Sequence, residues 1–309
     1  MIIHDGYENL NMVASVATLG IFDGVHLGHR ALLDRLVLRA KEEKSESVVI
    51  TFSPHPRLIL EKHNKKLSFL TTIEEKKVLL RSAGVDHLII INFTSEFSNI
   101  TACDFIKDIL VGKIGTKYLV IGYDHHFGKS GEGNFNTINE CAKDLDFRVE
   151  QVEGYHTDDG IISSSLIRGA LLKGDIGKAN NWLGYSYSVN GLIIEGRKLG
   201  RKIGFPTANI KPSYEHKLIP ANGVYAVEVQ LADKILPGML SIGSNPTVNS
   251  DPYFRSIEVH ILDFNEDIYG RNLTVIFRKR LRDEKKFGSL DELVKQMELD
   301  KQDTLRLLT

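Results

Sequence analysis

The sequence predicts a fold of class α/β plus β, with an α/β domain over residues 1–184 and a small β domain over residues 185–309. From residue 13 to about 183, apolar runs alternate with longer amphipathic stretches, as in a parallel sheet covered on both faces by helices. After Leu183 the runs shorten and are separated by glycine, asparagine and proline, which predicts a small antiparallel barrel. An amphipathic segment from Ser289 predicts a terminal helix on that barrel.

In the first domain, the expected strands are the runs richest in β-branched and apolar residues. They are Val13–Phe22, Ser47–Phe52, His87–Ile91, Lys117–Gly122 and Arg148–Val152. A helix is expected after Ser163–Ser165, whose hydroxyls suit a cap, and its apolar face is Leu166, Ile167, Ala170 and Leu171. The barrel strands are expected at Tyr185–Ile194, Val224–Leu231, Gly238–Ile242, Ser256–Leu262 and Asn272–Arg278. The apolar face of the terminal helix is expected to be Leu290, Leu293, Val294 and Met297.

The composition is that of an ordinary globular protein, with 42% hydrophobic residues and a net charge of −1. Because 39 basic residues are balanced by 40 acidic ones, nucleic acid is not expected as a partner. No apolar run approaches the roughly 20 residues of a membrane span, and the first residues do not resemble a secretion signal. Cys103 and Cys141 lack metal-ligand or redox spacing, so we expect buried, reduced thiols in a cytoplasmic protein.

Two histidines stand where an apolar run gives way to a helix start, in the segment TLGIFDGVHLGH over residues 18–29. Gly20, Gly24 and Gly28 let the backbone approach a ligand closely. His26 and His29 are three residues apart and project from one helix face, beside free backbone N–H groups and the positive end of the helix dipole. This setting favours polyphosphate. The alternative is a helix start with two solvated histidines.

Two further motifs also follow expected strand ends, namely TFSPHP over residues 51–56 and GYDHHFG over residues 122–128. Ligands of open α/β sheets bind outside the carboxyl ends of the strands, so we expect these loops to converge on the histidine motif. The prolines of the first loop are also compatible with a rigid turn that has no part in binding.

The string GIFDGVHLGH over residues 20–29 resembles the HxGH nucleotidylyltransferases, and within them the bacterial bifunctional riboflavin kinase/FAD synthetases. Other motifs of that family follow in order: TFSPHP and GYDHHFG as above, SSSLIR at 163–168, GFPTAN at 204–209, GVY at 223–225 and EVHILDF at 258–264. The resemblance covers nearly the whole chain. It implies a Rossmann-like nucleotidylyltransferase domain and a riboflavin kinase barrel. It also implies two reactions, phosphorylation of riboflavin to FMN with Mg²⁺ and ATP, and adenylylation of FMN to FAD with release of pyrophosphate.

For the first domain, the resemblance implies that His26 and His29 contact the ATP phosphates and stabilise the transition state, while Ser164 and Arg168 hold the β- and γ-phosphates. Further ATP-binding residues implied by the family motifs are Gly20, Phe22, Asp23, Gly24, Asp124 and Ser165. The implied flavin-side residues are Pro54, His55, Pro56 and Phe127. Without the resemblance, Arg168 would be interpreted as a surface arginine of an amphipathic helix.

For the barrel, the resemblance implies that Thr207 and Asn209 bind Mg²⁺ and the ATP phosphates, and that Glu258 takes the proton of the attacking ribityl hydroxyl. Gly196 and Lys202 belong to the implied ATP loop, and Tyr225 to the flavin side. From the residues alone, this loop would be a basic turn and Glu258 a solvated residue of a strand.

The chain departs from the family pattern at three positions. His125 stands where an aromatic residue is usual, Ser165 replaces the usual threonine, and Asn245 stands where arginine is common. The change at Asn245 leaves open an FAD synthetase with a weak or silent kinase domain. A non-catalytic sensor of flavin or nucleotide is the other alternative, although a general base and transition-state donors exceed what binding alone requires.

Overall fold

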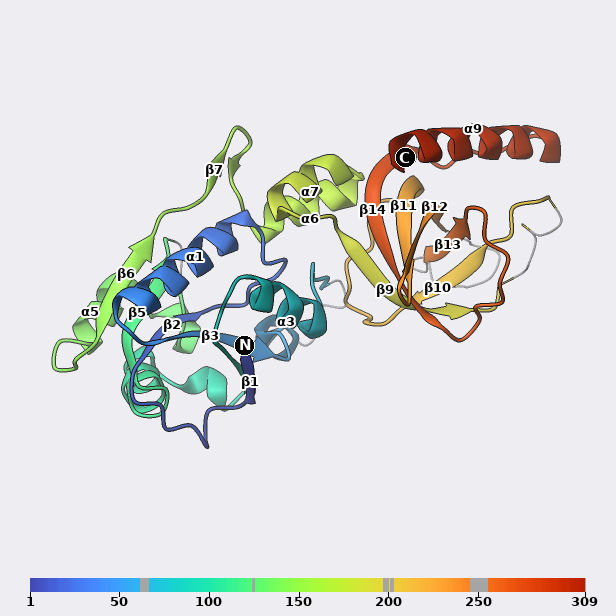
Figure 1. The fold of residues 1–309 in the computed structure, drawn as a ribbon. Coiled ribbons are helices and arrows are strands. Elements are labelled where there is room, and N and C mark those ends of the chain that lie inside the picture. Colours follow the sequence, from blue (N-terminus) through green and yellow to red (C-terminus); the bar gives the residue numbers. More distant parts are fainter. Residues whose placement is uncertain (62–66, 124–125, 197–199, 201–202, 245–254, 309) are drawn as a thin grey trace. The chain divides into compact units, whose positions relative to one another are not determined.

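The computed structural model describes residues 1–308 apart from 62–66, 124–125, 197–199, 201–202 and 245–254. The described chain divides into two compact units, Met1–Ser164 and Ser165–Thr309 (Figure 1). The division falls at the start of the helix that contains most of the SSSLIR motif of residues 163–168. The boundary between residues 184 and 185 therefore stays a prediction.

Within the described residues, the first unit holds a six-stranded parallel sheet in the order β1-β4-β3-β2-β5-β6. Its strands are β1 (Ile2–Asp5), β2 (Ser15–Leu19), β3 (Glu46–Ser53), β4 (His87–Asn92), β5 (Thr116–Gly122) and β6 (Arg148–Val152). In this order β2 lies between β3, which follows it in the sequence, and β5, which comes later on its other side. Order reversal of this kind opens a crevice at the carboxyl ends of the two central strands. The histidine motif follows β2 directly and thus lies at that crevice.

Helices cover both faces of this sheet, as the sequence predicted. They are α1 (Leu27–Glu42), α2 (Pro56–Leu60), α3 (Ile73–Ser82), α4 (Ala102–Asp104), the π-helix η2 (Phe105–Val111) and α5 (Phe135–Cys141), with single 3-10 turns η1 (Phe97–Asn99) and η3 (Lys129–Gly131). Successive residues of β2 serve opposite cores: Val16 packs in the cluster that holds Leu33 of α1 and Leu80 of α3, and Ala17 in the cluster that holds Ile106 of η2. A two-stranded hairpin, β7 (His156–Thr157) and β8 (Gly160–Ile161), precedes the serine motif.

The edge strand β1 was missing from the predicted elements because it is only four residues long and half of it is polar. It is held to β4 by a histidine pair, in which His4 Nε2 lies 2.9 Å from His87 Nδ1. The opposite ring nitrogen of His87, Nε2, lies 3.2 Å from a carboxylate oxygen of Glu46. Burial, and then the neighbouring His87, lower the pKa of His4 below its usual 6.5.

We expect this pair to make stability depend on pH. Since the folded state binds the His4 proton less readily than the unfolded chain does, stability is full above pH 6.5 and falls as the pH drops toward the lower, folded-state pKa. Urea unfolding at pH 7.5 and pH 5.5 should show a smaller loss of stability for His4→Gln than for the wild type. An unchanged loss in the variant would rule out His4 as its source.

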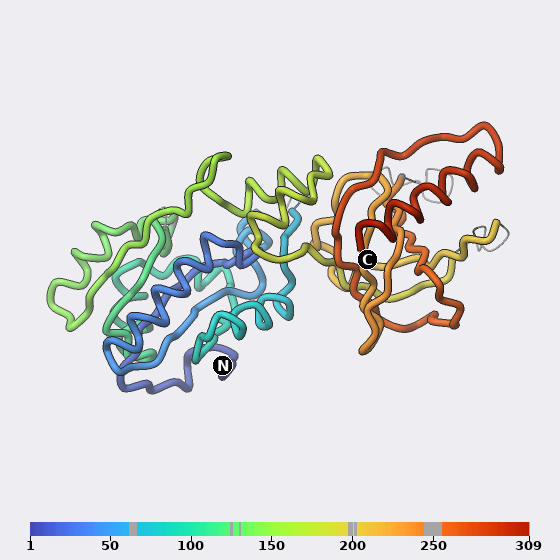
Figure 2. The backbone as a smooth tube through the Cα atoms, turned by 45° about the horizontal axis from the view of Figure 1, so that its top comes forward, coloured from blue at the N-terminus to red at the C-terminus, as the bar shows by residue number. Residues whose placement is uncertain are grey.

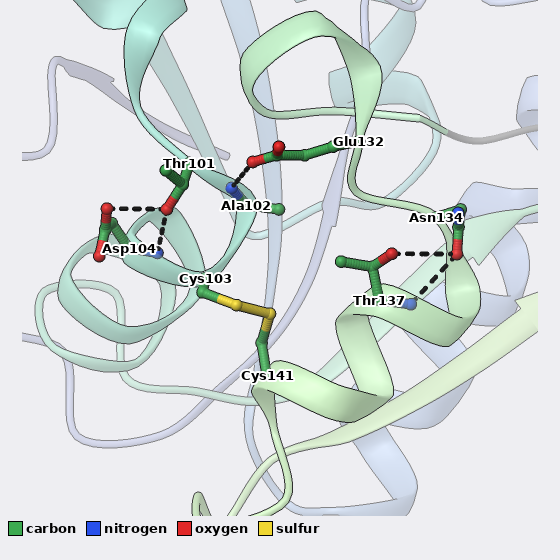
Figure 3. Close-up of a disulfide and its surroundings, with 8 residues drawn as sticks. All are labelled: Thr101, Ala102, Cys103, Asp104, Glu132, Asn134, Thr137 and Cys141. Carbon is green, nitrogen blue, oxygen red and sulfur yellow. Dashed lines mark hydrogen bonds between the residues drawn. A yellow bond between two sulfur atoms is a disulfide. The ribbon is translucent and has the colours of Figure 1, made fainter.

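Cys103 of α4 and Cys141 at the end of α5 form a disulfide, with Cα atoms 5.2 Å apart (Figure 3). The prediction of two buried, reduced thiols is therefore wrong, and Cys103 is also exposed. The two residues are 38 positions apart, and only the packing of α4 beside α5 brings their side chains within bonding reach. Figure 3 shows that the intervening loop is also attached to α4, because Glu132 accepts a hydrogen bond from the Ala102 amide at 3.0 Å.

Reduction of this disulfide should destabilise the first unit by about 3–4 kcal/mol, the loop-closure entropy for a bridge of this span. Urea unfolding followed by circular dichroism, with and without dithiothreitol, measures the loss. The fluorescence of Trp182, in the second unit, is the internal control. A Cys103→Ser/Cys141→Ser variant should unfold like the reduced protein and be insensitive to dithiothreitol; equal midpoints for oxidised and reduced wild type would contradict the expectation.

The second unit is a closed antiparallel barrel with strand order β10-β13-β12-β11-β14-β9, counted over the part of the chain that the structure describes. The strands are β9 (Ser188–Ile194), β10 (Ala208–Pro212), β11 (Gly223–Leu231), β12 (Lys234–Ser244), β13 (Arg255–Ile261) and β14 (Asn272–Arg282). The barrel was predicted, but β10 was not. Its five residues include Asn209 and Pro212, which are unfavourable in strands, yet β10 closes the barrel by pairing with both β9 and β13.

Among the described residues of the second unit, the helices are α6 (Ser164–Lys173), α7 (Ile176–Leu183) and α9 (Leu290–Leu308). The predicted terminal helix is confirmed and lies along the barrel in both Figure 1 and Figure 2. Val294 and Met297 pack on a small core formed by Phe205, Met239 and Leu262. Leu290 was placed on the apolar face, but 64% of it is exposed. Of the helices that the structure describes, none has the length and apolar character needed to cross a membrane.

Candidate functional site

The two motif histidines stack on each other at the start of α1. His26 is the N-cap, and its Nδ1 accepts a hydrogen bond from the His29 backbone N–H at 3.3 Å. An accepting Nδ1 carries no proton, so the neutral His26 ring has its donor at Nε2. The ring centroids are 3.7 Å apart with planes inclined by 18°. The structure therefore brings the predicted pair together, as helical spacing requires.

His29 is held in its neutral form. Burial, followed by the neighbouring His26 and Lys76, lowers the pKa of His29 well below its ordinary 6.5. Its Nδ1 is buried and has no hydrogen-bond partner among the described residues. A buried polar nitrogen without a partner costs stability unless a ligand satisfies it. The histidine pair is thus a polar, uncharged surface at a helix N-terminus, where backbone N–H groups favour anions.

The loop before the histidines has a strained backbone. Phe22 and Val25 adopt positive φ angles of 50° and 37°, although neither is glycine. Such conformations cost about 1 kcal/mol or more each and persist only where the surroundings impose them. The Phe22 ring is only 2% exposed and lies edge-on to His29 with centroids 5.2 Å apart. The Phe22 side chain thus packs in the core behind the histidines, and contact of this residue with ATP stays a prediction.

Asp23 and Ser164 fasten this loop. The Asp23 carboxylate accepts hydrogen bonds from the backbone N–H groups of Leu70 at 2.8 Å and Thr71 at 3.0 Å. The Thr71 hydroxyl in turn accepts from the Gly24 N–H at 3.0 Å, and the Ser164 hydroxyl donates to the Asp23 carbonyl at 2.8 Å. These predicted ATP-binding residues therefore hold the shape of the loop in this structure, and direct contact with ATP stays a prediction for them.

Sequence reasoning missed Lys76, a buried lysine of α3 near the histidines. Its Nζ lies 3.4 Å from the Thr51 hydroxyl at the end of β3. Burial lowers the pKa of Lys76 to about 8, against the opposing effect of the Asp23 carboxylate. A signal existed in the sequence, because Lys76 lies three residues after Ile73 and four before Leu80, on the buried face of the helix.

An aromatic cavity of about 710 Å³ begins at the same loop. Gly20 and Ile21 line one end of it, and Pro56 and Phe127 of the predicted flavin side also line it. Further aromatic lining residues, all missed from the sequence, are Phe52, Phe93, Phe97 and Phe105. The predicted residue His55 instead stacks on Phe69, with centroids 4.2 Å apart. Among the described residues that line the cavity, neither Pro54 nor His55 appears.

Other predicted residues of the first site are placed elsewhere or are not described. Ser165 and Arg168 lie on α6 in the second compact unit, where an Arg168 guanidinium nitrogen donates to the Ser165 hydroxyl at 3.2 Å. Their roles toward the nucleotide stay predictions. Asp124 and His125 lie outside the described residues.

The barrel gathers three predicted kinase residues in one place. The Thr207 hydroxyl donates to a Glu258 carboxylate oxygen at 3.2 Å, and Asn209 of β10 is the register partner of Glu258 on β13. Gly196 passes so close that an added Cβ would lie 2.0 Å from Asn209 Nδ2. A side chain at position 196 would therefore displace the Asn209 amide from its place beside Glu258.

Two cavities of the barrel share Thr207. One, of about 630 Å³, is lined by Glu258, Ser241 and His260 together with residues of α9; the other, of about 490 Å³, is lined by Pro206, Thr207 and Tyr269. Thr207 therefore lines both cavities, whereas Glu258 lines only the larger one. His260 was not predicted, although its position two residues after Glu258 places both on the cavity face of one strand.

His260 has a defined tautomer. Because the Pro206 carbonyl can only accept, His260 Nδ1 donates to it at 2.7 Å, and the neutral ring has its lone pair at Nε2. Burial lowers the pKa of His260. Tyr225, predicted on the flavin side, is fully buried in the barrel core, and its hydroxyl donates to the Ala221 carbonyl. Lys202 and Asn245 lie outside the described residues.

A helix start with two stacked histidines at the crevice of a parallel sheet, followed by a barrel whose Thr207 lines two cavities and contacts the Glu258 carboxylate, is the arrangement of a two-domain nucleotide-dependent transferase. The sequence model of FAD synthetase matches residues 9–166, and that of riboflavin kinase matches residues 183–308. The chain belongs to the bifunctional riboflavin kinase/FMN adenylyltransferase family.

Individual relatives agree over nearly the full chain. The bifunctional riboflavin kinase/FMN adenylyltransferase of Listeria monocytogenes is 38% identical, with 97% of this chain and 93% of the relative covered. The enzyme of the same name from Escherichia coli K12 is 38% identical over 96% of this chain and 94% of its own. A crystal structure described as a macrolide-efflux protein from Streptococcus pneumoniae has a TM-score of 0.89 and 33% identity, covering 98% of this chain and 99% of that one.

Proposed function

We propose that the α/β unit adenylylates FMN to FAD at the His26–His29 pair, and that the barrel phosphorylates riboflavin to FMN at Glu258. Both activities are those of the family to which the chain belongs. The observation that carries the first assignment is the stack of neutral imidazoles beside an aromatic cavity, with the buried His29 Nδ1 lacking a partner among the residues described.

In adenylyl transfer, a phosphate oxygen of FMN attacks the α-phosphorus of ATP. A new P–O bond forms, the bond from the α-phosphorus to the bridging oxygen of the β-phosphate breaks, and pyrophosphate leaves. The protein supplies alignment and donors for the charge on the phosphate oxygens. His26 and His29 with the first turn of α1 provide these donors, Arg168, Ser164 and Ser165 hold the β- and γ-phosphates, and the aromatic cavity receives the isoalloxazine ring.

In the kinase reaction, the terminal ribityl hydroxyl of riboflavin attacks the γ-phosphorus of ATP. Glu258 accepts the hydroxyl proton, the bond between the γ-phosphorus and the β–γ bridging oxygen breaks, and ADP leaves. Riboflavin occupies the cavity lined by Glu258, and ATP the cavity on the other side of Thr207. Thr207, which lines both cavities, supports this assignment of the two substrates.

Thr207 and Asn209 fit the Mg²⁺ of the kinase reaction. A hydroxyl and an amide oxygen are hard ligands of the kind that Mg²⁺ prefers, together with phosphate oxygens. The close passage of Gly196 over Asn209 forms a glycine cradle that a side chain would fill. When bound, the ion would neutralise charge on the ATP phosphates.

The proposal is tested by incubating the purified protein with Mg-ATP and either riboflavin or FMN, and following riboflavin, FMN and FAD by chromatography. Conversion of riboflavin through FMN to FAD, with release of pyrophosphate, is expected. Formation of FAD from FMN with riboflavin untouched would mean a synthetase with a silent kinase domain. Binding of FMN and ATP without pyrophosphate would mean a sensor.

A further inference from the structure

Lys76 is a buried cation that no sequence motif of the first site includes. It is only 6% exposed, whereas lysine is almost never fully buried unless its charge is compensated. The residue belongs to the inner face of α3 with Leu80, so its side chain extends from a packed helix toward the sheet. A charge at such a position costs free energy in the free protein, and this cost calls for a function.

The contacts of Lys76 place its ammonium next to the loop that joins β2 to α1 and leads to His26 and His29. Its Nζ donates to the Thr51 hydroxyl at 3.4 Å, and that hydroxyl lies 3.4 Å from the carbonyl of Ile21, one residue before Phe22. Lys76 is therefore separated by a single hydroxyl from the backbone that leads into the histidine motif.

Two ionisable groups face this ammonium from the elements packed against it. Asp23, on the loop between β2 and α1, attracts it. His29, on α1, is disfavoured in its charged form both by Lys76 and by the stacked His26 ring. The Asp23 carboxylate also accepts hydrogen bonds from the backbone N–H groups of Leu70 and Thr71. Its negative charge therefore both attracts Lys76 and holds the loop in place.

We propose that Lys76 is a positioning residue for adenylyl transfer: its buried ammonium, held against the Thr51 hydroxyl, supplies positive charge to the phosphates of bound ATP and adds to the burial that disfavours a second charge on His29. The inference rests on the proposed adenylylation site. A polyphosphate bound at the histidine pair would offset the burial cost of this cation, because its negative charge would attract the ammonium across the same loop. A neutral His29 remains stacked on His26, since two charged rings at that separation would repel each other.

The test uses the full chain with Lys76→Met, Lys76→Arg and, as a matched control, Lys77→Met. Methionine keeps the length of the buried side chain without the charge, and arginine keeps a charge that does not titrate below pH 12. Lys77 is the next residue of the same helix and pairs at the surface with Glu74. Urea unfolding of the first unit, followed by circular dichroism, reports whether each variant is folded, and riboflavin phosphorylation controls for the barrel.

The first readout is kcat/KM for Mg-ATP in FMN adenylylation between pH 6 and pH 10. For Lys76→Met we expect a loss of about 10²-fold at pH 7, the scale for removing one preorganised group from the transition state. The wild-type value should fall above about pH 8, where free Lys76 loses its proton. In Lys76→Arg this alkaline decline should move to higher pH, and Lys77→Met should match the wild type.

The second readout is the pKa of His29, measured by NMR titration. If Lys76 only packed in the core, its replacement would leave this pKa unchanged. Without the nearby cation, the pKa of His29 should rise in Lys76→Met and stay low in Lys76→Arg and Lys77→Met. The inference is overturned if Lys76→Met keeps the wild-type kcat/KM, or if it loses activity with His29 unmoved. Should Lys76→Met fail to fold, an alkaline decline of Lys76→Arg at the wild-type pH overturns it. A wild type that makes no FAD from FMN would instead refute the proposed function.

Discussion

Replacement of His29 by alanine is expected to lower the turnover of FMN adenylylation by about 10²- to 10³-fold, the effect of removing one transition-state donor. The ring stacks on His26, and its buried Nδ1 lacks a partner among the described residues. We expect a ring nitrogen without a protein partner to stabilise the transition state most strongly, when negative charge develops on the phosphate oxygens. The measurement is single-turnover release of pyrophosphate from ATP with saturating FMN.

Two controls make this result specific. His29→Asn keeps an N–H donor in a smaller side chain and should retain more turnover than alanine. Riboflavin phosphorylation in the barrel should be unchanged in both variants, which shows that the second unit stays folded. Because Phe22 packs edge-on against His29, urea unfolding of the first unit should also be recorded. If His29→Ala raised only KM and left kcat intact, the ring would contribute uniform binding and not transition-state stabilisation.

The second large effect is expected for Glu258→Gln, which should lower riboflavin phosphorylation by about 10²- to 10⁴-fold. Glutamine has the shape of glutamate, and its amide oxygen can still accept a hydrogen bond from Thr207. In the wild type, the Thr207 hydroxyl donates to Glu258 at 3.2 Å. What it loses is the ability to take the proton of the ribityl hydroxyl. The measurement is initial-rate formation of FMN from riboflavin and Mg-ATP.

Glu228→Gln is the matched control for this change. Glu228 lies on β11 of the same barrel and forms an ion pair with Arg278 at 2.7 Å, away from both cavities of the proposed kinase site. Its replacement should leave phosphorylation near the wild-type rate. Adenylylation of supplied FMN should proceed normally in both variants. Equal kinase activity of Glu258→Gln and wild type would remove Glu258 as the general base.

The histidine pair shows how much of a site can be predicted from spacing. Residues three apart at a helix start must share a face, and the structure confirms a helix beginning at Leu27 with the rings of His26 and His29 stacked. The convergence of Thr207 and Glu258 could not be derived in this way, because 51 residues separate them. It was expected from the resemblance to the family, and the barrel closure through β10 produces it.

Other features had a weak or misleading sequence signal. Tyr225 matched a family motif, yet the position of β11 within the barrel buries it in the core. The spacing places Lys76 on the apolar face of α3 with Ile73 and Leu80, but only the tertiary structure shows that its ammonium is buried. The aromatic wall of the first cavity comes from Phe52 and Phe93 at two strand ends and from Phe97 in a 3-10 turn, which have no common spacing.

The sequence by itself determined the two-domain order, the alternation of strands and helices, the helix start at the histidines and the family. These depend on periodicity, caps and motif order, which act within about one element and are therefore present in the linear chain. Only the tertiary structure decided that Cys103 bonds to Cys141, that Lys76 lies beneath the histidine loop and that Thr207 meets Glu258. Such pairs depend on how whole elements pack, and packing is set by side-chain shape and burial across the core and not by distance along the chain.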